Sequence, residues 1–234
     1  MYLARFEVDP RKREARKYLG KPQALHAAIM KAAAPQHGDQ GRVLWRIDEF
    51  GDRVFVVLLS PRQPALAALE EEAGVAGSTQ VGNYQLLRAK LAAGQQWRFR
   101  LTANPTRSLS TTVDMKTNEP LAQRPKRGKV VGHVTAEYQR EWLVKRAEQL
   151  GVRFLQHPGE SDPTKAAEVR VVERTRMAFE RFDPHQGRKR TVTINRATFE
   201  GALEIVDLDK FWRALTEGIG PAKAYGCGLM TLVM

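Results

Sequence analysis

The order of its regular segments is the feature of this chain that most limits its fold. Residues 2–9, YLARFEVD, alternate apolar and polar side chains, which indicates a strand. Residues 22–33 begin with proline and are rich in alanine, which favours a helix. Further strands are predicted at 43–48, 53–60 and 83–87, with a helix at 64–72. The first part of the chain therefore has the order β-α-β-β-α-β.

The same order returns after a short segment, 91–96, that we expect to be a linker. The second series comprises a strand at 97–103, a helix at 135–151, two long strands around the turn DPHQGRK (183–189), a helix at 208–218 and a last strand within 229–234. One β-α-β-β-α-β series is the ferredoxin-like unit. The order thus predicts an α+β fold of two tandem ferredoxin-like (RRM-like, βαββαβ) domains, residues 1–90 and 97–234.

The net charge of the chain points to a polyanionic partner. Its 38 Lys and Arg outnumber 26 Asp and Glu, which gives +12, and such a surface attracts nucleic acid. A soluble protein that is merely basic stays open as the alternative. No apolar run approaches the roughly 20 residues of a membrane span, and the N-terminus lacks the features of a signal peptide. With one cysteine, Cys227, no internal disulfide can form. We expect a cytoplasmic protein without a membrane partner.

The positive charge is concentrated in two segments of the second half. RPKRGK (124–129) lies in a stretch, 104–134, that resembles a loop, and GRKR (187–190) lies at the tip of the hairpin. Either segment could be a solvated, charged loop. Together they favour a phosphate-binding surface, because the arginine fork suits phosphate and a projecting hairpin can enter a duplex groove. The candidate residues are Lys126, Arg127, Lys129, Arg188, Lys189 and Arg190.

Among five histidines, His26 is the one inside a predicted helix. It lies at the edge of the apolar stripe, on one line with Gln23, where an imidazole can be both held and reached. A histidine there is more often structural. If the ligand is RNA, however, a ribose 2′-hydroxyl can attack its adjacent phosphate with one histidine and nearby cations as helpers, and no metal or cofactor is required. Lys31 is the nearest helical cation, but it points roughly 140° away from His26.

A glycine-rich segment, GIGPAKAYGCG (218–228), lies almost at the C-terminus. It follows a predicted helix and precedes the last strand, which is the wrong context for a dinucleotide or Walker loop. One interpretation is a compact connection whose glycines adopt positive φ. The other is that Lys223 and the backbone at Gly220, Gly226 and Gly228 face RNA phosphates.

Several of these blocks occur in one known family in the same order. They are MYLARFEVDP, PQALHAAIMKA, VLWRID, FRLTANPTRS, EWLVKRAEQLGVRF, TFEGALEIVD and GIGPAKAYGCGLMTL. The chain resembles the CasE-type CRISPR repeat-processing endoribonucleases, which belong to the repeat-associated mysterious protein (RAMP) superfamily and are subunits of type I-E Cascade. The resemblance implies metal-independent cleavage of precursor CRISPR RNA at the base of the repeat stem-loop. The products would carry a 2′,3′-cyclic or 3′ phosphate and a 5′-hydroxyl.

The resemblance also implies partners and site residues. The enzyme would stay on its product hairpin and contact other Cascade subunits. His26 matches the family histidine, Lys31 matches a basic position near the active site, and Arg107 and the two basic segments fall where relatives hold the RNA stem. The family tyrosine is replaced by Gln23, and whether Tyr18 substitutes for it is open. That replacement motivates the alternative, a non-catalytic subunit that binds an RNA hairpin.

Overall fold

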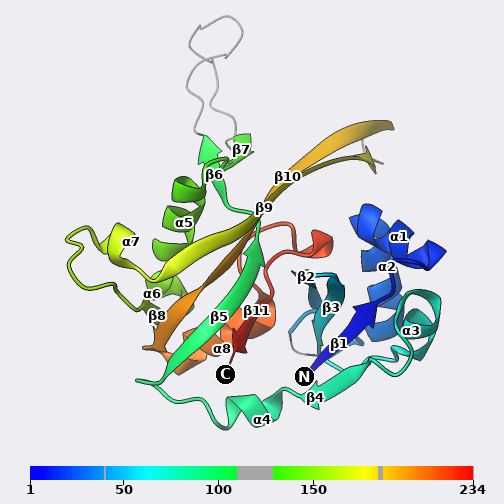
Figure 1. The fold of residues 1–234 in the computed structure, drawn as a ribbon, viewed down its shortest axis with the longest axis horizontal. Helices are drawn as coiled ribbons and strands as arrows, with labels where there is room; N and C mark the ends of the chain where they lie inside the picture. The colour runs from blue at the N-terminus through cyan, green and yellow to red at the C-terminus, as the bar shows by residue number, and fades with distance from the viewer. Residues whose placement is uncertain (40, 110–128, 184–186, 234) are drawn as a thin grey trace, which may run out of the picture.

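The computed structural model describes residues 1–39, 41–109, 129–183 and 187–233 (Figure 1). Lys126 and Arg127 lie outside the described residues. Within them the chain forms a four-stranded sheet, a larger antiparallel sheet and a two-stranded ribbon.

The first sheet is built from the N-terminal part of the chain. Its elements are β1 (Tyr2–Val8), α1 (Arg13–Gly20), α2 (Pro22–Ala33), β2 (Leu44–Phe50), β3 (Arg53–Ser60), α3 (Ala67–Ala73), β4 (Gln80–Asn83) and α4 (Gln85–Arg88), with strand order β2-β3-β1-β4. The predicted helix at 22–33 is confirmed. The strand predicted at 83–87 is wrong, because β4 ends at Asn83 and the Asn83 side chain accepts a hydrogen bond from the Gln85 amide, which starts a helical turn.

The second sheet is built from the C-terminal part. Its elements are β5 (Gln96–Ala103), α5 (Ala136–Val144), α6 (Ala147–Leu150), β8 (Val152–Phe154), α7 (Pro163–Ala166), β9 (Val169–Asp183), β10 (Arg188–Ile205), α8 (Leu208–Glu217), the 3-10 turn η1 (Lys223–Tyr225) and β11 (Met230–Val233). The order is β11-β5-β10-β8, and β9 also pairs with β10. The first strand of each half thus lies between the last strand and the third strand of its β-α-β-β-α-β series.

Two pairs of strands extend beyond the body of the second sheet. The stretch 104–134 is not entirely loop: β6 (Thr106–Leu109) pairs with β7 (Lys129–Gly132). The hairpin of β9 and β10 passes beyond the sheet toward α1 and α2 (Figure 1). Both basic segments found in the sequence are therefore attached to projecting strand pairs.

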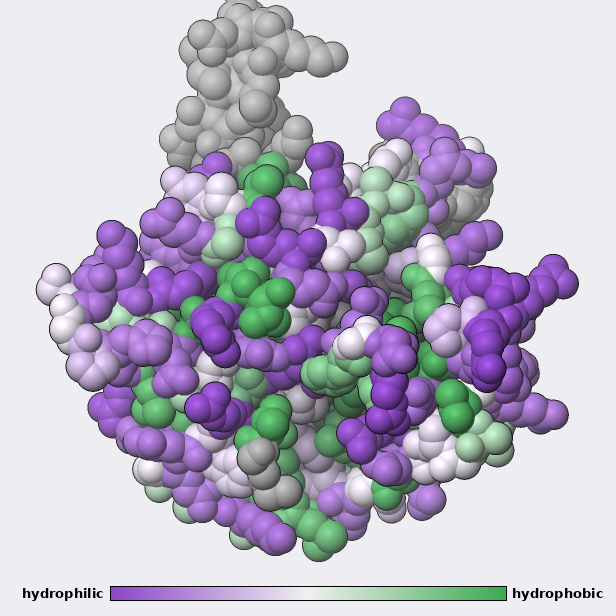
Figure 2. Space-filling view, in the orientation of Figure 1, coloured by the Kyte–Doolittle hydropathy of each residue, from purple (hydrophilic) through white to green (hydrophobic). Residues whose placement is uncertain are grey.

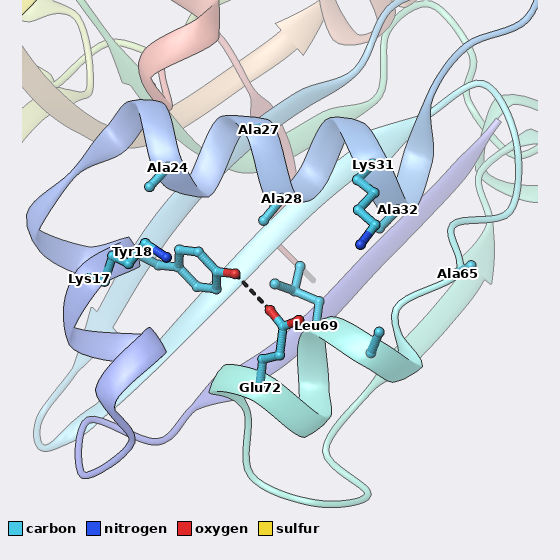
Figure 3. A pocket seen from close by; sticks show the side chains of 11 residues that line it. Lys17, Tyr18, Ala24, Ala27, Ala28, Lys31, Ala32, Ala65, Leu69 and Glu72 are labelled. Atoms are coloured by element: carbon cyan, nitrogen blue, oxygen red, sulfur yellow. Dashed lines mark hydrogen bonds between the residues drawn. The ribbon is translucent and has the colours of Figure 1, made fainter.

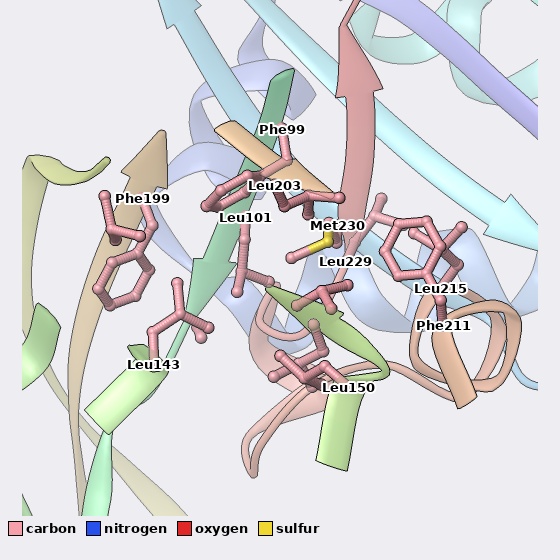
Figure 4. Close-up of a cluster of buried hydrophobic side chains, with 14 of the residues drawn as sticks. Phe99, Leu101, Leu143, Leu150, Phe199, Leu203, Phe211, Leu215, Leu229 and Met230 are labelled. Atoms are coloured by element: carbon pink, nitrogen blue, oxygen red, sulfur yellow. The ribbon is translucent and has the colours of Figure 1, made fainter. Parts of the chain in front are cut away.

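The two halves share apolar surface as well as a linker. One core lies between the first sheet and helices α1 to α3 and includes Phe6, Ile29 and Trp45. The other core belongs mainly to the second half (Figure 4), and it also takes in Leu44 and Leu59 from the first sheet. The first sheet is therefore covered on both faces.

A buried ionic network reinforces the junction between the sheets. Arg46 of β2 binds Asp48 through its guanidinium, with Nε to Oδ1 at 2.8 Å, and Arg100 of β5 binds the same carboxylate at 3.0 Å. Arg46 also donates to the carbonyl of Leu229 and the hydroxyl of Thr231. Because buried charges require such partners, the network fixes β2 against β5 and β11.

Candidate active site

His26 lies on α2 against the first sheet, partly buried as the helical pattern predicted. Its Nδ1 accepts a hydrogen bond of 3.2 Å from the indole Nε1 of Trp45, and the two rings lie nearly parallel at an interplanar angle of 24°. Trp45 is the second residue of β2 and has 1% of its surface exposed. The imidazole is therefore held by a rigid, buried side chain from the sheet.

The glycine-rich segment packs against the Trp45 ring of this pair. Gly226 has φ +77°, and a Cβ there would come within 2.8 Å of the Trp45 ring. Gly220 is similarly close to the Trp142 ring, at 2.9 Å, and Gly228 to backbone atoms of Ile219, at 3.1 Å. These three glycines thus allow the segment to approach buried aromatic rings and backbone, as the interpretation of a compact connection requires. Their contact with RNA phosphates stays a prediction.

The positive charge of Arg42 influences the pKa of both His26 and Lys223. Burial, with a smaller effect of Arg42, lowers the pKa of His26 below its ordinary value of 6.5. Burial and Arg42 also lower the pKa of Lys223, against an opposing effect of Glu217. The Lys223 ammonium donates a 2.8 Å hydrogen bond to the Gly220 carbonyl. An anion that approached His26 would meet an imidazole within the electrostatic reach of Arg42, which also acts on Lys223.

The β9–β10 hairpin reaches the same region. Gln23, one turn before His26 on the same face of α2, donates from Nε2 to the Glu180 carbonyl of β9 at 3.3 Å. Phe179 of β9 packs on Tyr225 of η1, with ring centroids 4.9 Å apart. The structure therefore brings the glycine-rich segment and the β9–β10 hairpin close to α2 and β2, the two elements that carry His26 and Trp45.

Lys31 of α2 and Tyr18 of α1 face the space between α2 and α3 (Figure 3). Both line a pocket of about 550 Å³ between α2 and α3 whose other lining residues include Ala28, Leu69 and Glu72. Tyr18 belongs to α1, the helix that precedes Pro22. Its hydroxyl donates to Glu72 at 2.7 Å, and burial together with this carboxylate raises its pKa to about 12. The structure brings neither Lys31 nor Tyr18 to His26.

The described cations of the two basic segments, together with Arg107, lie on the projecting strand pairs. Arg107 is exposed on β6. At the hairpin, Arg188 and Lys189 are exposed, and Lys189 forms an ion pair of 3.0 Å with Glu180 across the hairpin. Lys129 and Arg190 are located by their strands, opposite Leu109 and Arg181. Hydrophilic residues cover much of the face shown in Figure 2, with smaller apolar areas among them.

Two further features of the described residues bear on the class of site. No group of three or more His, Cys, Asp or Glu side chains is arranged to hold a metal ion in the part of the chain that the structure describes. In the same residues, no helix is long and apolar enough to cross a membrane.

Sequence reasoning missed Trp45 and Arg42 as parts of the site. Strand alternation at 43–48 could place Trp45 on one face of the sheet, but nothing local shows that this face meets His26. Arg42 precedes β2 and belongs to no basic segment, so its charge did not stand out in the sequence.

Comparison with known proteins assigns the chain to a family. The family described as CRISPR associated protein matches residues 1–233, and the chain belongs to it. Over 236 residues, 99% of either chain, it is 30% identical to the CRISPR-associated endoribonuclease Cse3 of Thermus thermophilus. It is 31% identical over 146 residues to the CRISPR system Cascade subunit CasE of Escherichia coli, which covers 61% of this chain and 60% of CasE.

The fold agrees with a solved structure of the same group. Cse3 bound to a 19-nucleotide RNA superposes with a TM-score of 0.76 at 25% identity, and the match covers 100% of both chains. The mixed α/β arrangement of antiparallel sheets is therefore shared along the entire chain, and the resemblance found in the sequence is confirmed.

Proposed function

We propose that this protein is an endoribonuclease that cleaves precursor CRISPR RNA at the base of the repeat stem-loop. The observation that carries the proposal is the convergence on His26 of the glycine-rich segment, Arg42 and the basic β9–β10 hairpin. The family membership and the name and bound RNA of the relative Cse3 support the substrate class.

The chemistry follows from what such a site can supply. The ribose 2′-hydroxyl beside the scissile bond attacks the adjacent phosphorus, and the 5′ oxygen leaves with a proton as a 5′-hydroxyl. The other product carries a 2′,3′-cyclic phosphate, which water can then open to a 3′ phosphate. Because the nucleophile belongs to the RNA, the reaction does not depend on a metal ion. His26 takes part in proton movement, while Arg42 and Lys223 stabilise the negative charge that grows on the phosphate oxygens.

Binding of the stem is assigned to the projecting strand pairs. Arg107 and the basic residues of both segments contact phosphates, and the enzyme stays on its product hairpin. It joins other Cascade subunits there, as the name of its relative CasE suggests. Gln23 offers an amide where the family has a phenol, so it can orient a phosphate by hydrogen bonding without transferring a proton.

We also propose that the two halves are tandem ferredoxin-like domains, residues 1–90 and 97–234, joined by 91–96. The equivalent strand pairings in the two sheets support this division. Leu44 and Leu59, which the first half contributes to the second core, mean that the domains are closely joined rather than independent.

The experiment compares His26→Ala with wild-type protein on a hairpin RNA that carries the repeat of a neighbouring CRISPR array, in EDTA. The variant should lose cleavage and keep hairpin affinity nearly unchanged. His37→Ala, at an exposed histidine outside the site, is the matched control and should cleave normally. Cleavage by His26→Ala at the wild-type rate would overturn the role of His26. Tight binding without product from wild-type protein would favour the alternative, a non-catalytic subunit.

A further inference from the structure

The hydrogen bond between Trp45 and His26 has a definite direction. An indole Nε1–H is a donor only, whereas an imidazole nitrogen donates or accepts according to its protonation. The 3.2 Å contact from Trp45 Nε1 to His26 Nδ1 therefore requires a lone pair on Nδ1. In the neutral ring, the single proton must then reside on Nε2.

Trp45 has little freedom to release this contact. It pairs with Leu58 of β3 and is 1% exposed. The backbone of Gly226 lies against the opposite part of its ring, at a distance that leaves no room for a Cβ. Because the indole is held by both the sheet and the glycine-rich segment, the orientation of its N–H is built into the fold.

Protonation of His26 conflicts with this arrangement. An imidazolium carries hydrogen on both nitrogens, so its Nδ1–H would point at the Nε1–H of Trp45. The charged groups on the surrounding elements either disfavour a charged imidazolium further or have no net effect on it. Arg42 before β2 and Lys223 of η1 are cationic, and Glu180 of β9 is paired with Lys189.

We propose that Trp45 is a positioning residue that holds neutral His26 in the tautomer with hydrogen on Nε2 and opposes protonation of Nδ1. If the chain is the ribonuclease proposed above, on which this consequence rests, neutral His26 meets the RNA as a hydrogen-bond donor. For Nε2 to accept a proton from the 2′-hydroxyl, as one form of the proton movement assigned to His26, the contact with Trp45 must open and the ring proton must move to Nδ1. Among the residues that the structure describes, none accepts a hydrogen bond from Nε2, so that N–H is available to a ligand.

Nitrogen-15 NMR of histidine-labelled protein tests the proposal without any RNA. In wild-type protein at a pH where His26 is neutral, Nε2 should bear the proton. In Trp45→Phe, which keeps an aromatic ring but removes the donor, the midpoint of the His26 titration should rise by about one pH unit. That shift corresponds to one net hydrogen bond to the neutral form.

Trp142→Phe is the matched control. Trp142 is also buried, at 4% exposure, and its indole nitrogen has no hydrogen-bond partner among the described residues. Its replacement should leave the His26 midpoint unchanged. A proton on Nδ1 in wild-type protein would overturn the proposal, and so would an unchanged midpoint in Trp45→Phe. If Trp45→Phe does not fold, the wild-type tautomer decides alone. A protein with the expected tautomer that cuts no RNA would refute the proposed function and leave this inference intact.

Discussion

Replacing Gly226 by alanine tests whether the glycine-rich segment supports the site by close packing. The new Cβ would lie 2.8 Å from Cζ3 of Trp45 and 3.1 Å from its Cη2, closer than side-chain carbons approach one another. Gly226 also has φ +77°, a conformation that L-residues adopt at a cost. The substitution therefore imposes two separate penalties, one from the backbone and one from the packing.

The two penalties can be given rough sizes. Left-handed backbone costs about 1–2 kcal/mol for a residue with a Cβ. Overpacking against a buried ring costs about 1–3 kcal/mol. Gly226→Ala should thus lower the free energy of unfolding by about 2–5 kcal/mol. Displacement of Trp45, and with it His26, should reduce cleavage by up to ~10²-fold, because small misplacements of reacting groups are costly.

Gly77→Ala supplies the matched comparison. Gly77 has nearly the same φ, +74°, but a Cβ there meets no other heavy atom within 4 Å in the described part of the chain. Urea unfolding of both variants should show a loss of about 1–2 kcal/mol for Gly77→Ala and a clearly larger loss for Gly226→Ala. Equal losses, or a Gly226→Ala enzyme with full activity, would refute the packing argument.

Three further predictions follow from the charges. Asp48→Asn should lower the free energy of unfolding by about 3–5 kcal/mol in a denaturant titration, because it leaves Arg46 buried without its carboxylate. Burial raises the pKa of Asp48, but Arg46 and Arg100 outweigh it and hold this pKa below 3.8. Its stabilisation should therefore be present above pH 3.8 and disappear as the pH falls through the lower, folded-state pKa. Arg42→Gln should raise the pKa of His26, since the arginine lowers it, and an NMR titration would show the midpoint moving upward. Hairpin affinity should fall steeply with salt, and each phosphate contact removed by an alanine at the β9–β10 tip should reduce the slope of log affinity against log salt by about one.

Local patterns predicted most of the regular elements. The helix at 22–33 was predictable because Pro22 suits a first turn and alanines extend it. The single helix expected at 135–151 is instead two, α5 and α6. Arg146 lies over the Trp142 ring and donates to the Trp142 carbonyl at 2.6 Å, which satisfies the end of α5. This contact joins residues only four apart, but a side-chain interaction with the helix end leaves no periodic signal.

The candidate site was predictable only in part, because its contacts join distant segments. The position of His26 at the flank of α2 follows from helical spacing. Its contact with Trp45, and the contact of Trp45 with Gly226, join segments far apart in the chain. Which face of β2 meets which helix, and where the C-terminal turn packs, is decided by the assembly of both sheets. The sequence could therefore indicate His26 as a candidate catalytic residue without indicating what holds it.

In the proposed mechanism, the RNA's own 2′-hydroxyl is the nucleophile at a site organised by His26. The most direct test compares the natural hairpin with one that has a single 2′-deoxy nucleotide at the scissile position, both in EDTA. We expect the deoxy hairpin to bind with unchanged affinity and to remain uncut, while the natural RNA yields a 5′-hydroxyl product. Cleavage of both RNAs at the same rate would contradict the account.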